Sequence, residues 1–580
     1  MSKKSSWMIV IIIAALFLFI GVLLLGTYRL LSPSKIDMTE NSVLELSFSG
    51  EIPELPPHSP LAQFVQRDGV SLYELGRLLQ VASRDPHIVA IHLSSHSLGF
   101  SWAQVEEVRG FLKEFRQSNK KVVASLFGDM PEEKDFYLVS QSDEIYLNPD
   151  AGLLINGLNV DVPFFKRTME KLHIEPQMIM LKEYKNPETY TREKFTPEFR
   201  SMYEGILTDV QDRFIQTVAE DRKISPLRLR AFMNIGMTPA ALALKEGLVT
   251  ALGYDDEVRA RLVAEQRTGS KKYRGVTASQ YLEAVRHRID KKARHRIALL
   301  GGIGQIISGK SEDVWGEMMG GETMVARLRE IGEDKEIEGV LFRVDSPGGS
   351  AVGSDKIWRE IRLLEKSGKK VIVSMSGVAG SGGYYIAMGA SKIVAEPSTI
   401  TGSIGVLFAK FNVRGLLEHW LGVNTDQIKM ADNADIFSLF HSLSEDQKTQ
   451  VQSWMEDIYK NFVQKAAEGR GMTFDELEPK AHGRIYTGAQ AKEIHLIDEI
   501  GGLNTALQLL KKELKIPESE EVQIILYPKP KSLWQSLSEG ELFKTYLSTS
   551  TPSIESRLKE IIHGLETPSP CLLLPEAEIR

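Results

Sequence analysis

The chain contains an internal duplication, because four blocks of its first half recur in the same order in its second half. DPHIVAIHLSS, which begins at Asp85, pairs with DKEIEGVLFRVDS, which begins at Asp334, at a spacing of 334 − 85 = 249 residues. KKVVASL from Lys120 pairs with KKVIVSM from Lys369 at the same spacing. NPDAGLLINGL pairs with EPSTITGSIGV, and GMTPAALALKEGLVTALGYDDEV with GRIYTGAQAKEIHLIDEIGG. Four ordered matches predict two similar structural units in tandem.

Each half alternates short apolar runs with amphipathic helical patterns. VLFRV and KVIVSM are rich in β-branched residues, which is typical of strands, whereas SDKIWREIRLLEK shows the apolar spacing of one helix face. Strands and helices that alternate in this way form βαβ units around a mostly parallel sheet. The predicted fold class is therefore α/β.

The repeats also set the predicted domain boundaries. The first repeat is assigned to residues 40–263 and the second to 297–530. Residues 264–296 are basic and polar, and we interpret them as a connector that contains a helix. Beyond Pro528 the sequence has no clear periodicity, so 531–580 is assigned as a C-terminal tail without a function of its own.

The N-terminus has the properties of a membrane anchor. No charged residue occurs from Ser5 to Tyr28. At about 1.5 Å per residue, a helix over 7–28 covers the roughly 30 Å hydrocarbon layer of a bilayer. A cleaved signal peptide is the alternative, but its apolar centre is shorter and ends in a small-x-small site, whereas this run continues into LLLGTYR. The pattern favours an uncleaved anchor.

The charges that flank this segment predict its orientation. Lys3, Lys4 and the terminal amine outnumber Arg29 on the other side. Because the more positive flank stays inside, residues 1–6 are expected in the cytoplasm and the rest of the chain on the extracytoplasmic side.

Composition excludes several classes of function. With 42% hydrophobic and 25% charged residues, the 580-residue chain is globular and long enough for several domains. A formal net charge of −7 provides no basic surplus for nucleic acid. Cys571 is the single cysteine, so no intrachain disulfide is possible, and the twelve histidines form no cluster with metal-ligand spacing. No metal and no cofactor are predicted.

Ser381 is the candidate nucleophile. It stands in VIVSMSGVAGSGGYY, where an apolar strand runs through a turn of small residues into a helix, and backbone N–H groups at a helix start stabilise negative charge. Gly348 and Gly349 follow an earlier strand and, together with Gly382, are candidate oxyanion donors. The alternative is two ordinary glycine-rich turns of an α/β fold.

A serine nucleophile needs a base, and histidine is the usual one. AGSGG partly matches the G-x-S-x-G elbow of α/β-hydrolases, with Ala379 in place of the first glycine. The histidines that such an enzyme would need downstream are His419, His441, His482 and His495, and none stands in a recognisable context. A Ser–His acyl hydrolase stays an open alternative.

Several motifs resemble one protease family. DSPGGS, SGGYY, EPSTITGSIGV and RIYTGAQAKEIHLIDEIGG look like the second half of the long, duplicated form of the signal peptide peptidases of family S49, and LKEYKNPETYTREKFTPEFR is similar to the lysine segment of that family. The resemblance covers about residues 40–530 and the N-terminal anchor. It implies two tandem domains of the crotonase/Clp protease-like fold.

The long form of this family divides its serine and lysine between the two copies, and the sequence shows the same division. Where the second half has GSGGYY, the first has PEEKDFY, so a serine is missing there. Where the first half has Lys185 in MIMLKEYKN, the alignment of the second half places Ala434. The resemblance implies that Ser381 is the nucleophile, that Lys185 is the general base and that Ser403 orients the lysine.

Lysine acts as a base only if burial lowers its pKa from about 10.4 towards neutrality, so the site is expected to be buried. The resemblance also implies a homotetramer in a bacterial inner membrane, with a single membrane pass and a periplasmic catalytic body that degrades cleaved signal peptides and short hydrophobic peptides. A non-catalytic membrane scaffold and a coenzyme A enzyme of the crotonase type are further alternatives.

Overall fold

The computed structural model describes residues 41–57, 69–185, 188–266, 272–289, 292–311 and 318–529, together with the backbone of 571–573. The predicted cytoplasmic tail 1–6 and anchor 7–28 lie outside these ranges, as does most of the C-terminal tail. Of the helices in the described ranges, none combines the length and the apolar composition that a bilayer crossing needs.

The first half folds around a six-stranded sheet in which all pairs are parallel. Its strand order is β8-β4-β3-β2-β1-β9. The strands are β1 (Ser42–Gly50), β2 (Ile88–Leu98), β3 (Lys121–Leu126), β4 (Glu144–Leu147), β8 (Ala251–Leu252) and β9 (Gly275–Thr277). Residues 264–296, predicted as a connector, thus contribute the edge strand β9 and the helix α12 (Ala278–Ile289).

The second half repeats this strand order as β20-β16-β15-β13-β10-β21, again with parallel pairs. These strands are β10 (His295–Ile303), β13 (Gly339–Ser346), β15 (Lys370–Gly380), β16 (Lys392–Ala395), β20 (Glu499–Ile500) and β21 (Val522–Tyr527). An antiparallel pair accompanies each sheet: β5 (Gly152–Ile155) with β7 (Gly236–Pro239), and β17 (Ile400–Gly402) with β19 (Ile485–Thr487). The predicted α/β class with mostly parallel sheets is confirmed.

The duplication extends to single side chains. Lys120 Nζ donates hydrogen bonds to the carbonyl oxygens of Ala82 and Asp85, at 2.7 and 2.6 Å. Lys369, 249 residues later, donates in the same way to the carbonyls of Ile331 and Asp334, which are also displaced by 249 residues. In both halves a lysine directly before a central strand satisfies carbonyls at the C-terminal end of a helix from the previous βα unit, Leu72–Arg84 in the first half and Gly321–Glu333 in the second.

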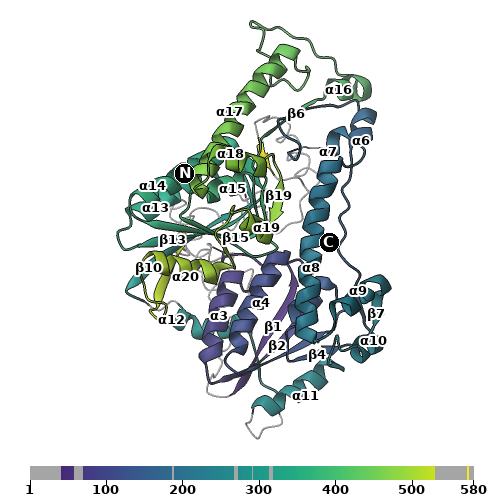
Figure 1. Cartoon of the computed structure of the whole chain (residues 1–580), viewed down its shortest axis with the longest axis vertical. Coiled ribbons are helices and arrows are strands. Elements are labelled where there is room, and N and C mark those ends of the chain that lie inside the picture. Colours follow the sequence, from purple (N-terminus) through teal and green to yellow (C-terminus); the bar gives the residue numbers. More distant parts are fainter. Residues whose placement is uncertain are drawn as a thin grey trace, which may run out of the picture.

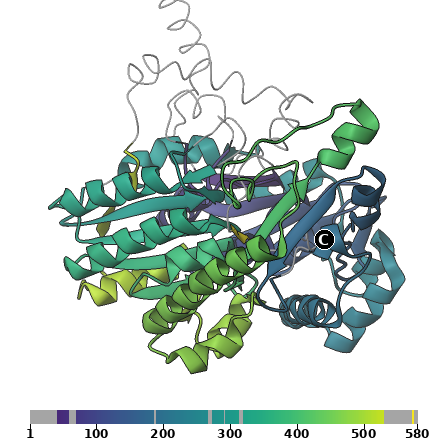
Figure 2. The ribbon, with the colours of Figure 1, turned by 90° about the horizontal axis from the view of Figure 1, so that it is seen from above.

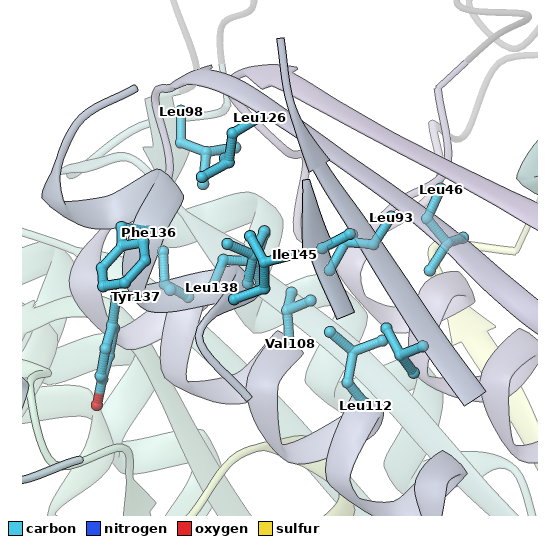
Figure 3. Close-up of a cluster of buried hydrophobic side chains, with 14 of the residues drawn as sticks. Leu46, Leu93, Leu98, Val108, Leu112, Leu126, Phe136, Tyr137, Leu138 and Ile145 are labelled. Atoms are coloured by element: carbon cyan, nitrogen blue, oxygen red, sulfur yellow. The ribbon is translucent and has the colours of Figure 1, made fainter. Parts of the chain in front are cut away.

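Packing of helices on these sheets makes the cores. In the first half, α3 (Leu72–Arg84) and α4 (Trp102–Arg116) each begin with a capping box, from Ser71 and Ser101. Figure 3 shows apolar side chains of α4 and of α5 (Glu133–Val139) pointing toward those of the sheet. The strands are nearly continuous apolar runs because helices and the neighbouring repeat cover both faces.

A third sheet joins the two halves. Its order is β12-β11-β14-β22-β18-β6. The strands are β6 (Glu175–Met180), β11 (Gln305–Ile307), β12 (Met318–Gly320), β14 (Gly348–Ser350), β18 (Leu407–Asn412) and β22 (Cys571–Leu573). β6 of the first half pairs antiparallel with β18 of the second over six residue pairs, from Glu175↔Asn412 to Met180↔Leu407.

A buried ion cluster also links the halves. Arg343 on β13 is 1% exposed, and its guanidinium lies 2.7 Å from Glu54 and 2.5 Å from Glu107, both in the first half. Ser374 and Ser376 accept further hydrogen bonds from it. Separating the halves would leave a buried charge without its partner, which costs several kcal/mol, so this cluster holds the two halves in one relative position.

The long helix α8 (Pro197–Arg222) runs along the molecule and packs against β19 of the second half (Figure 1). Beyond it, α6 (Lys166–Lys171) and α16 (Arg414–Leu421) lie together at one end of the long axis, away from α3 and α4 (Figure 1). Viewed from above, this end projects to one side of the sheet of the second half and its flanking helices (Figure 2).

Candidate active site

Ser381 lies at a sharp turn between β15 and α15 (Gly382–Ala387), where it is the N-terminal cap residue. Its φ of 55° is in the left-handed region, which a serine rarely adopts, and its N–H donates to Gly402 O at 2.8 Å. The residue is fully buried. Strained backbone of this kind concentrates at functional sites, since the surrounding structure must stabilise it.

Lys185 reaches this serine from the first half of the chain. Its Nζ lies 2.7 Å from Ser381 Oγ, although the two residues are 196 positions apart. The same Nζ lies 2.8 Å from Ser403 Oγ and 3.3 Å from Ser403 O. Lys185 is 1% exposed. The three predicted residues therefore form one buried cluster that draws on both halves.

Ser403 is placed by β17, which ends one residue before it. Its backbone also has a positive φ, 53°, and its N–H donates to Arg484 O at 2.7 Å. Thr401 Oγ1, two residues earlier, donates to Ala379 O at 2.7 Å and so ties β17 to the strand that carries Ser381. Ser403 itself is fully buried. The backbone hydrogen bonds of Ser381 and Ser403, together with the bond from Thr401, fix the positions of the two serines whose hydroxyls contact Lys185.

The loop that carries Lys185 is held by the segment after α17 (Glu445–Arg470). Tyr184 N–H donates to His482 O at 3.1 Å. Lys182 Nζ lies 2.6 Å from Glu478 Oε1, and His482 Nε2 lies 2.9 Å from the same oxygen. The hydrogen bonds from Lys182 and His482 hold the pKa of the Glu478 carboxyl below its usual value. We name Lys182, Glu478 and His482 the lysine-loop latch.

Gly483 lies directly against the backbone and the Cβ of Lys185. Its φ is 79°, and a Cβ at this position would lie 2.4 Å from Lys185 Cβ and 2.6 Å from Lys185 N. Only glycine fits there. The sequence analysis missed the roles of the lysine-loop latch and of Gly483, although Gly483 is the first residue of the repeated block GRIYTGAQ.

The glycines predicted as oxyanion donors lie beside Ser381. A Cβ on Gly382 would lie 3.0 Å from Gly348 Cα and 3.1 Å from Gly349 N, so the two glycine turns touch. Gly348 and Gly349 have φ values of 103° and 147°. The Gly348 N–H donates to Ser346 Oγ at 3.2 Å. Gly349 and Gly382 are thus the more suitable pair of donors.

The corresponding position of the first half carries a different group. Glu132 is the N-terminal cap residue of α5, as Ser381 is of α15, and the two are 381 − 132 = 249 positions apart. The next residue, Glu133, is buried and its carboxylate accepts the N–H groups of Asn156 and Gly157 at 2.6 and 2.8 Å. Burial raises the pKa of Glu133. A carboxylate therefore occupies this turn in the first half.

The candidate histidines do not surround Ser381. His419 packs against His173 at the projecting end of the molecule, with 4.2 Å between ring centroids and 39° between the ring planes. His482 belongs to the lysine-loop latch, and its Nδ1 faces Glu183 at 3.1 Å. Among the described residues, the side-chain contact recorded for Ser381 Oγ is with Lys185. Ala434, which aligns with Lys185, is exposed in a turn.

Comparisons with known proteins identify the family to which the chain belongs. The model of peptidase family S49 matches the chain twice, over residues 114–268 and 364–517. The chain is 30% identical over 537 residues to "Serine protease SPPA, chloroplastic" of Arabidopsis thaliana, covering 91% of this chain and 76% of that protein. It is 28% identical over 511 residues to "Protease 4" of Haemophilus influenzae, covering 86% and 81%.

A shorter relative matches one part of the chain. "Putative signal peptide peptidase SppA" of Enterococcus faecium is 38% identical over 202 residues, which are 35% of this chain and 58% of that protein. The double match of the family, together with relatives that cover most of the chain, accounts for the duplication seen in sequence and structure. The chain belongs to peptidase family S49 and is a serine protease.

Proposed function

We propose that this protease cuts peptide bonds with a Ser381–Lys185 dyad that is divided between its two repeats. The observation that carries the proposal is the 2.7 Å contact between Lys185 Nζ and Ser381 Oγ in a fully buried position. Burial disfavours the ammonium form of a lysine, and the neutral amine is the form that can accept a proton. The positive φ of Ser381, at a sharp turn between a strand and a helix, supports a nucleophilic role.

The proposed reaction proceeds through an acyl-enzyme. Lys185 Nζ takes the hydroxyl proton while Ser381 Oγ attacks the scissile carbonyl, and the resulting ammonium gives that proton to the leaving amine. Water then attacks the ester, with Lys185 again as the base. Ser403 Oγ orients the amine throughout. Backbone N–H groups of Gly349 and Gly382, with Gly348 beside them, stabilise the oxyanion. No metal or cofactor takes part.

The proposed substrates are cleaved signal peptides and other short hydrophobic peptides. The name of the Enterococcus faecium relative, a putative signal peptide peptidase, supports this assignment. We assign both α/β repeats, 40–263 and 297–530, to the crotonase/Clp protease-like fold, which the shared strand order supports. The apolar segment 7–28 supports a single-pass anchor in a bacterial inner membrane with the body in the periplasm.

We further propose that the protein assembles as a homotetramer. Large apolar side chains are exposed on the projecting end of the molecule: Trp420 is 58% exposed, Leu421 65%, Ile428 93% and Met430 94%. An apolar patch of this kind is typical of an interface. Sedimentation of the detergent-solubilised protein tests the assembly, and a monomer at micromolar concentration would contradict it.

Fluorophosphonate labelling tests the dyad, together with cleavage of a hydrophobic reporter peptide. Wild type should be labelled and should cut, whereas Ser381→Ala and Lys185→Ala should do neither. Lys194→Ala, which changes an exposed lysine of the same segment, serves as the control and should behave as wild type. Full activity of Lys185→Ala would contradict the dyad. If His482→Ala abolished labelling while Lys185→Ala did not, the result would support a Ser–His acyl hydrolase. If the wild type were neither labelled nor active, the result would support a non-catalytic membrane scaffold.

A further inference from the structure

The C-terminal tail returns to the active site as a strand. β22 pairs antiparallel with β14, with Gly348 opposite Leu573, Gly349 opposite Leu572 and Ser350 opposite Cys571. On its other side, β22 pairs antiparallel with β18 through Cys571 and Leu407. The tail, for which the sequence analysis found no function, thus contributes the strand beside the predicted oxyanion glycines.

This strand fills a place that other peptides could occupy. In the third sheet β14 and β18 are not neighbours, and β22 lies between them. Without it, two strand edges would present unpaired main-chain N–H and C=O groups toward the same gap. A gap between two edges accepts an extended peptide by main-chain hydrogen bonding, which is the β-augmentation mode of recognition.

The gap lies at the proposed dyad. Gly349, which pairs with Leu572, has its backbone nitrogen 3.1 Å from the point where a Gly382 Cβ would stand, next to Ser381. β18 begins four residues after Ser403. A peptide that crosses from β14 to β18 therefore passes the cluster of Ser381, Lys185 and Ser403, which is where a substrate has to lie.

The sequence of the tail suits this place. Residues 570–575 read P-C-L-L-L-P, an apolar run between two prolines. Proline cannot donate to a ladder, so the prolines limit the strand to the run between them. The run has the composition of the short hydrophobic peptides that we propose as substrates. From Lys529 the chain has 571 − 529 = 42 residues in which to reach the site, about 140 Å when extended.

We propose that the segment 571–573 is an internal competitive inhibitor, which occupies the substrate strand between β14 and β18 of its own chain. This inference rests on the proposed function of the site. A peptide substrate has to displace the segment before it can bind. If the segment fills the gap about nine-tenths of the time, the apparent KM is raised about tenfold while kcat is unchanged.

Leu572→Pro in the full-length protein tests the inhibitor, because proline removes a backbone N–H from the middle of the strand. We expect KM for the reporter peptide to fall several-fold with little change in kcat, and fluorophosphonate labelling of Ser381 to become faster. The synthetic peptide PSPCLLLPEAEIR should inhibit the variant competitively. Leu565→Pro, the same change upstream of the paired residues, is the matched control and should retain wild-type kinetics.

Equal KM values and equal labelling rates for wild type and Leu572→Pro would overturn the inhibitor, and so would failure of the peptide to compete. These outcomes differ from failure of the proposed function, in which wild type and variant alike would neither be labelled nor cut. A change shared by Leu572→Pro and Leu565→Pro would also overturn it, because the effect would then belong to the tail in general and not to the strand.

Discussion

Two hydroxyls contact the Lys185 amine, and they are expected to contribute differently to the reaction. Ser381 is the proposed nucleophile, whereas Ser403 only holds the amine in place, at 2.8 Å. Ser403→Ala should lower kcat about 10- to 100-fold, the effect of one lost hydrogen bond to a group that becomes charged, with little change in KM. Steady-state kinetics on the reporter peptide measure this split.

Ser391→Ala is a suitable control for this prediction, since its hydroxyl bonds Glu365 in the same repeat and makes no contact with Lys185 in the described structure. A variant Ser403→Thr, which keeps a hydroxyl, should recover part of kcat. Equal kcat for Ser403→Ala and wild type would show that the amine needs no second partner.

Ser381 and Lys185 could be predicted as site residues from the sequence, because the two repeats can be aligned and differ at these two positions. The missing serine at Glu132 and the missing lysine at Ala434 indicated which half supplies which group. The distances themselves could not be predicted. The hydrogen bond from Gly348 N–H to Ser346 Oγ could not be predicted either, because it depends on the side-chain rotamer of a buried serine.

At the level of elements, the loop after β6 is positioned by the segment between α17 and β19. Gly483→Ala places a methyl group 2.4 Å from Lys185 Cβ, which is too close for two carbon atoms, and should displace the lysine and its amine. Because a displacement of about 1 Å can cost about 100-fold in rate, kcat should fall by at least that factor. The fluorophosphonate labelling rate should fall in parallel.

Gly471→Ala separates this displacement from backbone strain. Gly471 ends α17 with a φ of 64°, close to that of Gly483, and a Cβ there meets nothing within 4 Å. Backbone strain should cost both variants about 1 kcal/mol of unfolding free energy, measured with denaturant, and the close contact with Lys185 should cost Gly483→Ala more; only Gly483→Ala should lose activity. Equal activity losses in the two variants would assign the effect to strain.

The parallel strands and their flanking helices follow from local periodicity, which explains why they were predicted. β6, β18 and β22 were not, since their partners are distant in sequence and each is short. β6 and β18 are not equivalent positions of the two repeats, so the duplication offered no guide to their pairing. Long-range pairing of this kind depends on how the whole molecule closes.

At the level of the whole molecule, the repeats meet across a buried charged cluster that local sequence patterns do not reveal. Arg343 lies within an otherwise apolar run, VLFRV, and the sequence around it does not indicate a charged partner. Its partners Glu54 and Glu107 come from the other repeat, 289 and 236 residues away. Two domains were predictable from the duplication, but the surface through which they join was not.

Glu396, next to this cluster, should make the stability of the molecule depend on pH. Burial raises the pKa of its carboxyl well above the usual value, and the carboxylates of Glu107 and Glu106 raise it further, while Arg343 opposes them. A raised pKa means that the folded state binds the proton more tightly than the unfolded chain. The stabilisation is therefore complete below the unfolded pKa of about 4.3 and is lost as the pH rises through the folded value.

Glu396→Gln removes the titrating group and keeps the size of the side chain. We expect the variant to be more stable than wild type above the raised pKa, where wild type has to bury a charge, and the difference to shrink as the pH falls toward 4.3. Denaturant unfolding at a series of pH values measures this. Glu336→Gln, at an exposed carboxylate, is the control. A pH-independent difference between Glu396→Gln and wild type would show that Glu396 does not titrate between the two states, and that the repeats join without a buried neutral carboxyl.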